Sequence, residues 1–335
     1  MYICYMRVFK KPPKYVKLLA KAAKYYNIDL IYSHPKDVDV GNEVINGLIL
    51  QNNVWRQVEL PAPPYIDLNS YCYKYKDVIT FLKKKSTLLN PKGFGTKQKV
   101  YNTLMEDGEF AKYLPDTIQV TDFDDFLKFI KKYDKAILKP RSGHKGNGVY
   151  LIHKIDDKSY RLSFKNEEKV LPAEELKAHI EDIITDQVYL AQQYIQSLTA
   201  TGDPYDCRIR LEKDAEGKWA VAIYLVRIGS NNKVVSNVAQ GGGVQKLIPF
   251  IQFHYPASWE NIKADFNYIA ECLPPKIEAL YQKQTSCLGI DIGIDKDEQI
   301  YIYEVNAAPG MEFGEAEIIN LKVDYYHYLQ QQAGE

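Results

Sequence analysis

Three oxygen-bearing side chains near the C-terminal end of the sequence could hold a metal ion. Asp291 lies in the segment GIDIGID, and Glu304 and Asn306 lie in YIYEVNAAPG. Side chains alternate faces along a strand, so Glu304 and Asn306 share a face, and Asp291 falls on the paired strand of a predicted hairpin. Carboxylate and amide oxygens suit Mg²⁺, whose octahedral shell phosphates and water would complete. The alternative is a hairpin whose polar residues only flank its turn and the following loop.

A glycine-containing loop in the middle of the chain is typical of a phosphate-binding flap. The strand AILKP brings Lys139 to its end, and the loop that follows contains Ser142, Gly143, Gly146 and Gly148. Glycine lets backbone N–H groups turn toward an anion, and a lysine at the strand end can contact phosphate as a point charge. No Gly-Lys-Ser/Thr precedes a helix, so the P-loop pattern is absent. An inert glycine loop between two hairpin strands is the alternative.

The apolar strand QVYLAQQYI could contact an adenine ring. The backbone of Gln193 and Ile195 could hydrogen-bond the adenine edge, with Tyr194 or Ile195 packed near the ring. An ordinary core strand is the alternative.

Two arginines could steady the oxygens of a phosphoryl group or an acyl phosphate. Arg208 lies on the predicted strand DCRIRLEK, and Arg227 begins a polar loop that contains Asn237 and ends in three glycines. Asp206 and Arg208 are two positions apart and so share a face. The alternative is salt bridging on a sheet face. Cys207, between them, is interpreted as a strand residue rather than a nucleophile.

The surrounding sequence predicts alternating strands and helices that would position these groups. Residues 1–90 open with a βαβ unit, and a strand pair follows that turns at Asn52-Asn53. One helix is predicted from Lys97, and another from a start resembling a capping box at Thr121. Pro and Gly in LLNPKGFGT mark a boundary. We therefore expect three lobes, at residues 1–90, 91–192 and 193–335.

Composition excludes several classes of protein. The chain has 335 residues, and its 43 basic and 43 acidic side chains cancel, so nothing favours bulk attraction to nucleic acid or to a membrane. No apolar run approaches the ~18 residues that span a bilayer, and the N-terminus lacks a signal-peptide layout. Five scattered cysteines form no CxxC pair, which favours neither disulfides nor zinc. These features predict a cytoplasmic protein.

The order of these features resembles the ATP-grasp superfamily over roughly residues 90–315. It consists of Lys97, Lys139 with its glycine loop, the QQYI hinge, Asp206-Cys207-Arg208, Arg227 with its loop, and Asp291 with EVNAAPG. RIGSNNKVVSNVAQGGG and LGIDIGID further resemble the spore-coat-associated YheC/YheD-like branch and the RimK-type glutamate ligases. The resemblance implies an α/β (α+β) protein of ATP-grasp fold, with an N-terminal βαβ lobe followed by two α+β lobes that clasp ATP.

The resemblance also implies roles for individual residues. Lys97 and Lys139 would contact nucleotide phosphates, the loop from Ser142 to Gly148 would cover them, Gln193 to Ile195 would hold the adenosine, and Asn237 would complete the nucleotide site. Asp291, Glu304 and Asn306 would bind one or two Mg²⁺ ions, or Mn²⁺ in their place, with Arg208 and Arg227 near the reacting centre. RimK-type ligases usually carry Glu where this chain has Gln193, so we expect an altered ribose contact.

The reaction so implied is ATP-dependent carboxylate–amine ligation through an acyl phosphate, with release of ADP and phosphate. Its substrates would be a small carboxylate and amine, or a protein or peptide acceptor, and the first ninety residues match no pattern that decides between them. Two alternatives stay open: a non-catalytic ATP-binding structural protein of a spore envelope, and a kinase-like phosphotransferase. A homo-oligomer is a further expectation, because dimers and tetramers are frequent among the proteins that the chain resembles.

Overall fold

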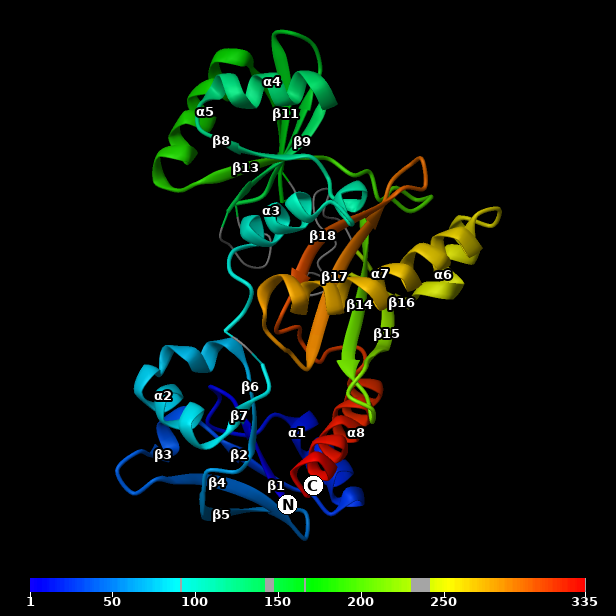
Figure 1. Cartoon of the computed structure of the whole chain (residues 1–335). Coiled ribbons are helices and arrows are strands. Elements are labelled where there is room, and N and C mark those ends of the chain that lie inside the picture. Colours follow the sequence, from blue (N-terminus) through cyan, green and yellow to red (C-terminus); the bar gives the residue numbers. More distant parts are fainter. Residues whose placement is uncertain (91, 142–147, 166, 230–241, 335) are drawn as a thin grey trace.

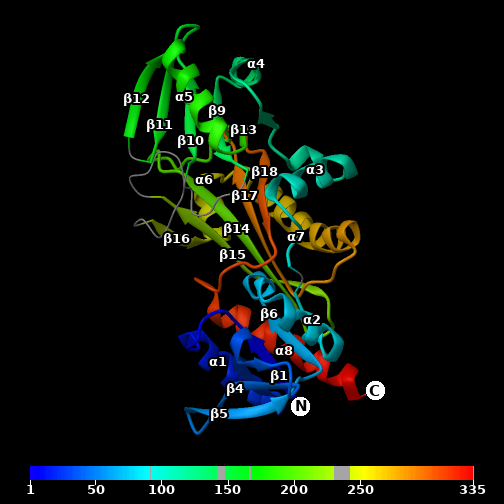
Figure 2. The same cartoon turned by 90° about the vertical axis from the view of Figure 1, so that its left-hand side faces the viewer.

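The chain folds into three lobes, each built around one β-sheet, in the computed structural model shown in Figures 1 and 2. The structure describes residues 1–90, 92–141, 148–165, 167–229 and 242–334. In Figure 1 the N-terminal lobe lies at the bottom, a five-stranded lobe in the middle and a six-stranded lobe at the top. After the N-terminal lobe the chain runs past the middle lobe and forms the top lobe. It then returns to form the strands of the middle lobe.

The N-terminal lobe contains the predicted βαβ unit. Its strand order is β3-β4-β2-β1-β6-β7 with β5 paired to β4, and β1 is parallel to both β2 and β6. Asn52 and Asn53 have φ values of 49° and 64°, and they turn the chain between β4 and β5 as predicted. The elements are β1 (Tyr2–Met6), α1 (Lys14–Ala23), β2 (Asp29–Ser33), β3 (Val38–Asp39), β4 (Val44–Gln51), β5 (Val54–Pro61), β6 (Tyr65–Leu68), α2 (Lys76–Lys85) and β7 (Thr87–Leu88).

The six-stranded lobe has the order β12-β11-β10-β9-β13-β8, and helices α4 and α5 bury one face of the sheet. Its elements are β8 (Thr117–Val120), α4 (Phe123–Tyr133), β9 (Lys135–Pro140), β10 (Tyr150–Lys154), β11 (Ser159–Phe164), β12 (Glu167–Pro172), α5 (Ala173–Asp186) and β13 (Tyr189–Gln193). The helix start predicted at Thr121 is wrong by one residue. Asp122 is the N-cap, because its carboxylate accepts the N–H of Asp125 at 2.9 Å.

The five-stranded lobe is an antiparallel sheet in the order β16-β15-β14-β17-β18. Its strands are β14 (Tyr205–Lys213), β15 (Trp219–Ile228), β16 (Gly243–Lys246), β17 (Cys287–Ile294) and β18 (Ile300–Asn306). One face packs against α6 (Leu247–His254) and α7 (Trp259–Tyr281), with Phe250 and Phe266 fully buried in the core. Helix α3 (Lys97–Asp107) adds Val100 and Leu104 to this same core. The other face is left to polar side chains.

The last helix, α8 (Glu315–Gly334), returns to the N-terminal lobe. Its residues Ile319, Val323 and Tyr326 share a buried core with Ile3 and Tyr5 of β1. The N- and C-termini accordingly lie close together in Figure 1. The lobe boundaries at residues 90 and 192 stay a prediction. Helix α3 packs on the core of the five-stranded lobe rather than of the lobe to which those boundaries assign it, whereas α8 contacts both the N-terminal lobe and strands β14 and β15 of its own lobe.

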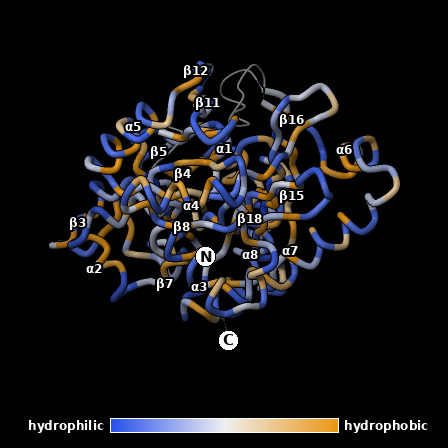
Figure 3. Tube along the Cα trace, turned by 90° about the horizontal axis from the view of Figure 1, so that it is seen from above, coloured by the Kyte–Doolittle hydropathy of each residue, from blue (hydrophilic) through white to orange (hydrophobic). Residues whose placement is uncertain are grey.

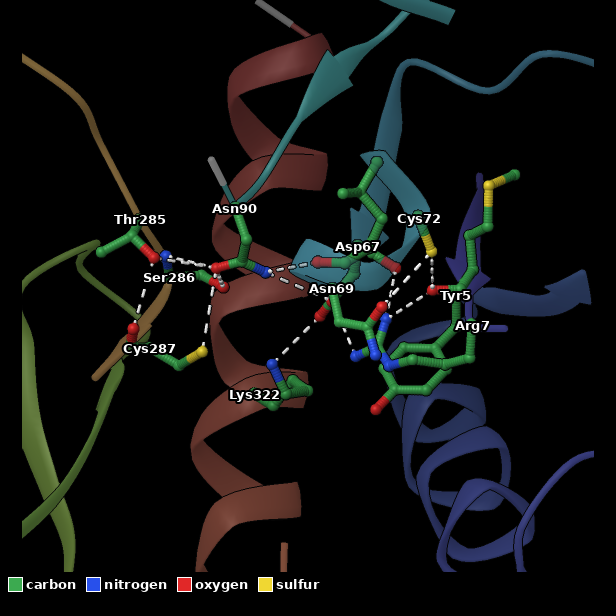
Figure 4. A network of polar contacts seen from close by, with 12 residues as sticks. Tyr5, Arg7, Asp67, Asn69, Cys72, Asn90, Thr285, Ser286, Cys287 and Lys322 are labelled. Atoms are coloured by element: carbon green, nitrogen blue, oxygen red, sulfur yellow. Dashed lines mark hydrogen bonds and ion pairs between the residues drawn. The ribbon is translucent and has the colours of Figure 1, made fainter. Parts of the chain in front are cut away.

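A buried polar network joins the N-terminal lobe to α8, as Figure 4 shows. The Asp67 carboxylate is fully buried and accepts hydrogen bonds from Arg7 Nη2 and Lys322 Nζ at 3.0 Å and from Tyr326 Oη at 2.7 Å. Burial raises the pKa of Asp67, but Lys322 and Arg7 outweigh it and hold that pKa far below its usual value. Asp67 is therefore ionised and fully paired.

Figure 3 shows hydrophilic and hydrophobic residues interspersed along the chain. Within the part of the chain that the structure describes, no helix is long and apolar enough to cross a membrane. All five cysteines are free thiols.

Candidate active site

Asp291 lies at the centre of the polar face of the five-stranded sheet. Its Cα pairs with Arg208 of β14 on one side and with Glu304 of β18 on the other. Directly paired residues of neighbouring strands point to the same face, so the three side chains converge. Asn306 joins them, with its Nδ2 3.4 Å from Asp291 Oδ2. The sequence prediction that Asp291, Glu304 and Asn306 share one face thus corresponds to the observed strand register.

Two arginines hold the Asp291 carboxylate. Arg208 donates from Nε and Nη2 to the two carboxylate oxygens, each at 2.7 Å, in a bidentate pair. Arg227 places its Nη2 3.1 Å from Asp291 Oδ1 and donates from Nε to Asp206 at 2.6 Å. Burial raises the pKa of Asp291, but the two arginines outweigh it and lower that pKa, so the carboxylate is ionised at neutral pH.

Two lysines reach the same region from different elements. Lys97, at the start of α3, places its Nζ 2.8 Å from Glu304 Oε2. Lys139, at the end of β9, donates from Nζ to Gln192 Oε1 at 2.8 Å. Burial and the nearby Lys97 lower the pKa of Lys139 to about 8, and Glu304 opposes them. Because Lys97 and Glu304 both act on Lys139, the six-stranded lobe presents this lysine to the polar face of the five-stranded sheet.

The predicted adenine hinge follows β13 and connects the six-stranded sheet to the five-stranded sheet. The N–H of Gln193 donates to the carbonyl of Asp116 at 2.8 Å, and the carbonyl of Ile195 accepts from Ser197 at 2.9 Å. Burial raises the pKa of the intervening Tyr194, whose phenol stays protonated. These two bonds involve neither the carbonyl of Gln193 nor the N–H of Ile195.

Part of the predicted nucleotide site lies outside the described residues, namely Ser142, Gly143, Gly146 and Asn237. The last glycine of the loop, Gly148, is described and has a φ of 71°. A Cβ at this position would also lie 3.0 Å from the hydroxyl of Tyr189. The backbone conformation therefore favours glycine here, and a Cβ would in addition crowd the Tyr189 hydroxyl.

Sequence reasoning missed the partners of the cationic residues. Gln192 orients Lys139, and Asp206 orients Arg227, yet neither belongs to the predicted site. Both contacts join residues of two neighbouring strands. They depend on the register in which these strands pair, and the local sequence does not predict that register. Cys207 lies within β14 as expected, and burial raises the pKa of its thiol well above the usual value, so it is not a thiolate nucleophile.

The donor set fits an oxygen-ligated divalent cation. Two carboxylates and one amide meet on one sheet face, and each carboxylate is already paired with a protein cation. Among the residues that the structure describes, no group of three or more His, Cys, Asp or Glu side chains could hold a metal. The protein would supply few ligands, which is the usual arrangement for Mg²⁺ bound together with phosphate.

The part of the chain that contains this site is similar in sequence to known proteins. The family model described as YheC/D like ATP-grasp matches residues 85–329. Endospore coat-associated protein YheC of Bacillus subtilis (strain 168) is 25% identical over 307 residues, which cover 87% of this chain and 84% of YheC. Endospore coat-associated protein YheD of the same organism is 23% identical over 279 residues, which cover 79% of this chain but only 61% of YheD.

Solved structures show the fold. The ATP-grasp ligase PsnB complexed with a minimal precursor is similar with a TM-score of 0.59, 14% identity and 98% coverage of both chains. Another PsnB structure, with a TM-score of 0.57 and 14% identity, contains the precursor, Mg and ADP and covers 99% of this chain and 98% of that one. D-cycloserine synthetase DcsG has a TM-score of 0.55 and 11% identity, with coverage of 98% of this chain and 100% of DcsG. The three-lobed architecture is therefore that of the ATP-grasp fold.

Proposed function

We propose, starting from the fact that this chain belongs to the YheC/D-like ATP-grasp family, that it is an ATP-dependent ligase joining a carboxylate to an amine. One observation carries the proposal: Asp291, Glu304 and Asn306 converge with four cationic side chains that come from two sheets and one helix. A purely structural sheet face would need no such concentration of paired charge.

In this proposal the nucleotide lies between the six-stranded and the five-stranded sheets. Lys97 and Lys139 contact its phosphates, the loop ending at Gly148 covers them, and the segment from Gln193 to Ile195 holds the adenosine. Asp291, Glu304 and Asn306 would hold Mg²⁺, or Mn²⁺ in its place. The ion would neutralise charge on the phosphate oxygens. The pKa of Lys139 is lowered to about 8. A bound phosphate would raise this pKa again, because its negative charge favours the protonated amine.

The proposed reaction needs no side-chain nucleophile. A substrate carboxylate attacks the γ-phosphorus of ATP, ADP leaves, and an acyl phosphate forms. An amine then attacks the acyl carbon, inorganic phosphate leaves, and the amine loses one proton as the amide forms. Arg208 and Arg227 supply fixed positive charge beside the transferring group, because both are already oriented by Asp291.

The carboxylate or the amine is proposed to belong to a peptide. PsnB is a ligase whose structures contain a precursor peptide, and that likeness in fold motivates the choice. The names of YheC and YheD motivate a second proposal, that the protein associates with a spore coat. A structural protein that binds ATP without ligation is the competing function, and the same two names favour it.

The test is release of ADP and phosphate from Mg-ATP in the presence of pooled amino acids, small carboxylates and peptides, with products scanned by mass for condensation. Stoichiometric ADP, phosphate and a condensed product are expected. Binding of ATP without product in every pool would favour the structural protein, and ADP without phosphate would indicate a phosphotransferase.

The variant Glu304→Ala tests whether the turnover depends on the candidate metal-binding residues. It removes a carboxylate that pairs with Lys97 outside the apolar core, so we expect loss of ATP turnover with an unchanged circular dichroism spectrum. Glu167→Ala, which removes an exposed carboxylate from the edge strand β12, is the matched variant and should keep full turnover. Turnover by Glu304→Ala at the original rate would refute the metal assignment.

A further inference from the structure

A cavity of about 760 Å³ opens beside the metal-binding residues of the candidate active site. Glu304 and Asn306 form one side of it, and the N-terminal lobe contributes Ser70 and Tyr71 on another. The segment between the N-terminal lobe and α3 contributes a third side. The cavity therefore lies where the N-terminal lobe meets the five-stranded sheet.

The charged lining of this cavity is strongly basic. Its cationic residues come from four separate segments, and they are Lys92, Lys97, Lys99, Arg141 and Lys283. Glu304 is the one acidic residue among the described residues that line it, and Lys97 already pairs with Glu304 at 2.8 Å. The chain as a whole has 43 basic and 43 acidic residues, so this excess is local. A concave surface with charge of one sign concentrates ligands of the opposite sign.

Strand order points to the same cavity independently of charge. Strand β1 pairs in parallel with β2 on one side and with β6 on the other. The sheet is thus extended first to one side of β1 and later to the other, so the strand order reverses between β1 and β6. Ligands of open α/β sheets bind outside the carboxyl ends of the strands at such a switch point. Ser70 and Tyr71 follow the carboxyl end of β6 closely, and both line the cavity. Tyr71 is 60% exposed although it is a large aromatic residue.

The cavity is distinct from the proposed adenosine site. Neither Lys139 nor any residue from Gln193 to Ile195 lines it, and it shares with the nucleotide site only the end where Lys97, Glu304 and Asn306 lie. A ligand in the cavity can therefore be present together with a nucleotide, and its reacting group would meet the terminal phosphate at that shared end.

We propose that this basic cavity, defined by Lys92, Lys97, Lys99, Arg141, Lys283 and Tyr71, binds an acidic peptide segment and presents one of its carboxylates to the phosphoryl group. The assignment rests on the proposed ligase function. Lysines predominate in the lining, and each contacts an anion as a single point charge, which suits carboxylates spaced along a chain better than one planar or bidentate group. Tyr71 and Tyr281 offer ring surface to the backbone and methylene groups between those carboxylates.

Fluorescence anisotropy with the full-length protein tests the assignment without requiring turnover. The probes are a dye-labelled oligoglutamate, an oligoglutamine of equal length and a single-stranded oligonucleotide, each with and without the non-hydrolysable nucleotide Mg-AMPPNP. We expect oligoglutamate alone to bind, and to bind both with and without the nucleotide. Equal binding of oligoglutamine or of the oligonucleotide would overturn the proposal, as would displacement of oligoglutamate by Mg-AMPPNP.

The variant pair Lys92→Glu and Lys99→Glu locates the binding. Glutamate at position 99 lies three residues after the N-cap Thr96, where it favours the start of α3, so the fold should be retained. We expect the double variant to lose about tenfold or more in affinity for oligoglutamate, with nucleotide affinity unchanged. The control reverses two exposed lysines of α4, as Lys128→Glu and Lys131→Glu, and should bind as the original protein does. Equal loss in both double variants would contradict the assignment.

The outcome separates this inference from the proposed function. Binding of oligoglutamate at the basic cavity without any ligated product would support the cavity and count against ligation. Ligation of a neutral or small substrate by a protein that does not bind oligoglutamate would support the ligase and overturn the inference.

Discussion

Asp67 and Asp291 are both carboxylates held between two cationic side chains, in two different regions of the molecule. Asp67 pairs with Arg7 and Lys322 between the N-terminal lobe and α8, and its side chain is 0% exposed (Figure 4). Asp291 pairs with Arg208 and Arg227 on the polar face of the five-stranded sheet, and its side chain is 11% exposed. The two clusters have similar chemistry and differ in their access to water.

The difference indicates which cluster serves the fold and which can serve a reaction. Around Asp67, the hydroxyl of Tyr326 and the amide of Asn90 complete the carboxylate's hydrogen bonds, so no ligand could enter without unfolding the interface. Around Asp291, the cations are about a fifth exposed, and Glu304 and Asn306 lie beside it. A buried ion pair is stable only when every partner is present, whereas a partly hydrated one can exchange partners.

Removal of the buried carboxylate should have the largest effect. Asp67→Ala leaves Arg7 and Lys322 buried with a lost partner, so the free energy of unfolding should fall by about 3–5 kcal/mol. Chemical denaturation followed by circular dichroism measures the change. The control is Asp297→Ala, which breaks an exposed pair with Lys296 and should leave the free energy of unfolding almost unchanged. A similar loss in Asp297→Ala would show that the effect of Asp67→Ala does not come from burial of its ion pairs.

The same substitution at the candidate active site should cost less stability and more function. After Asp291→Ala, Asp206 still pairs with Arg227, and Arg208 is 21% exposed and can be hydrated. The free energy of unfolding should therefore fall by only about 1–3 kcal/mol. Titration calorimetry should show weaker binding of ATP in the presence of Mg²⁺ and little change in its absence. A destabilisation as large as that of Asp67→Ala would show that Asp291 is mainly structural.

The pH dependence of Lys139 should give the smallest effect. With its pKa lowered to about 8, this lysine is mostly charged at pH 7 and mostly neutral at pH 9. Affinity for Mg-ATP should fall roughly tenfold between these two values, as measured by titration calorimetry. The variant Lys139→Arg stays charged and should show no such fall. A fall of equal size in that variant would place the titrating group elsewhere.

Stability should respond to pH in the opposite direction. The unfolded chain holds the Lys139 proton up to its ordinary pKa of 10.5, whereas the folded protein releases it near 8. The unfolded state thus binds more protons in this window, so the contribution of Lys139 to stability rises as pH increases.

The sequence predicted much of the local structure because short-range signals determine it. The Asn52-Asn53 turn, the βαβ opening and the hairpin that carries Asp291 and Glu304 follow from turn residues and side-chain periodicity. The partners Gln192 and Asp206 could not be predicted in the same way, since strand register creates their contacts. The apolar stripe of α8 predicts burial but does not say against which lobe.

The return of α8 to the first strand has a consequence for how the protein is made. Ile3 and Tyr5 leave the ribosome long before Val323 and Tyr326, which complete their core. Lys322, the partner of Asp67, is also made after the strands of the other two lobes. The core of the first lobe therefore stays open until α8 has been made, and a chain that terminates before α8 would expose that core to chaperones and proteases.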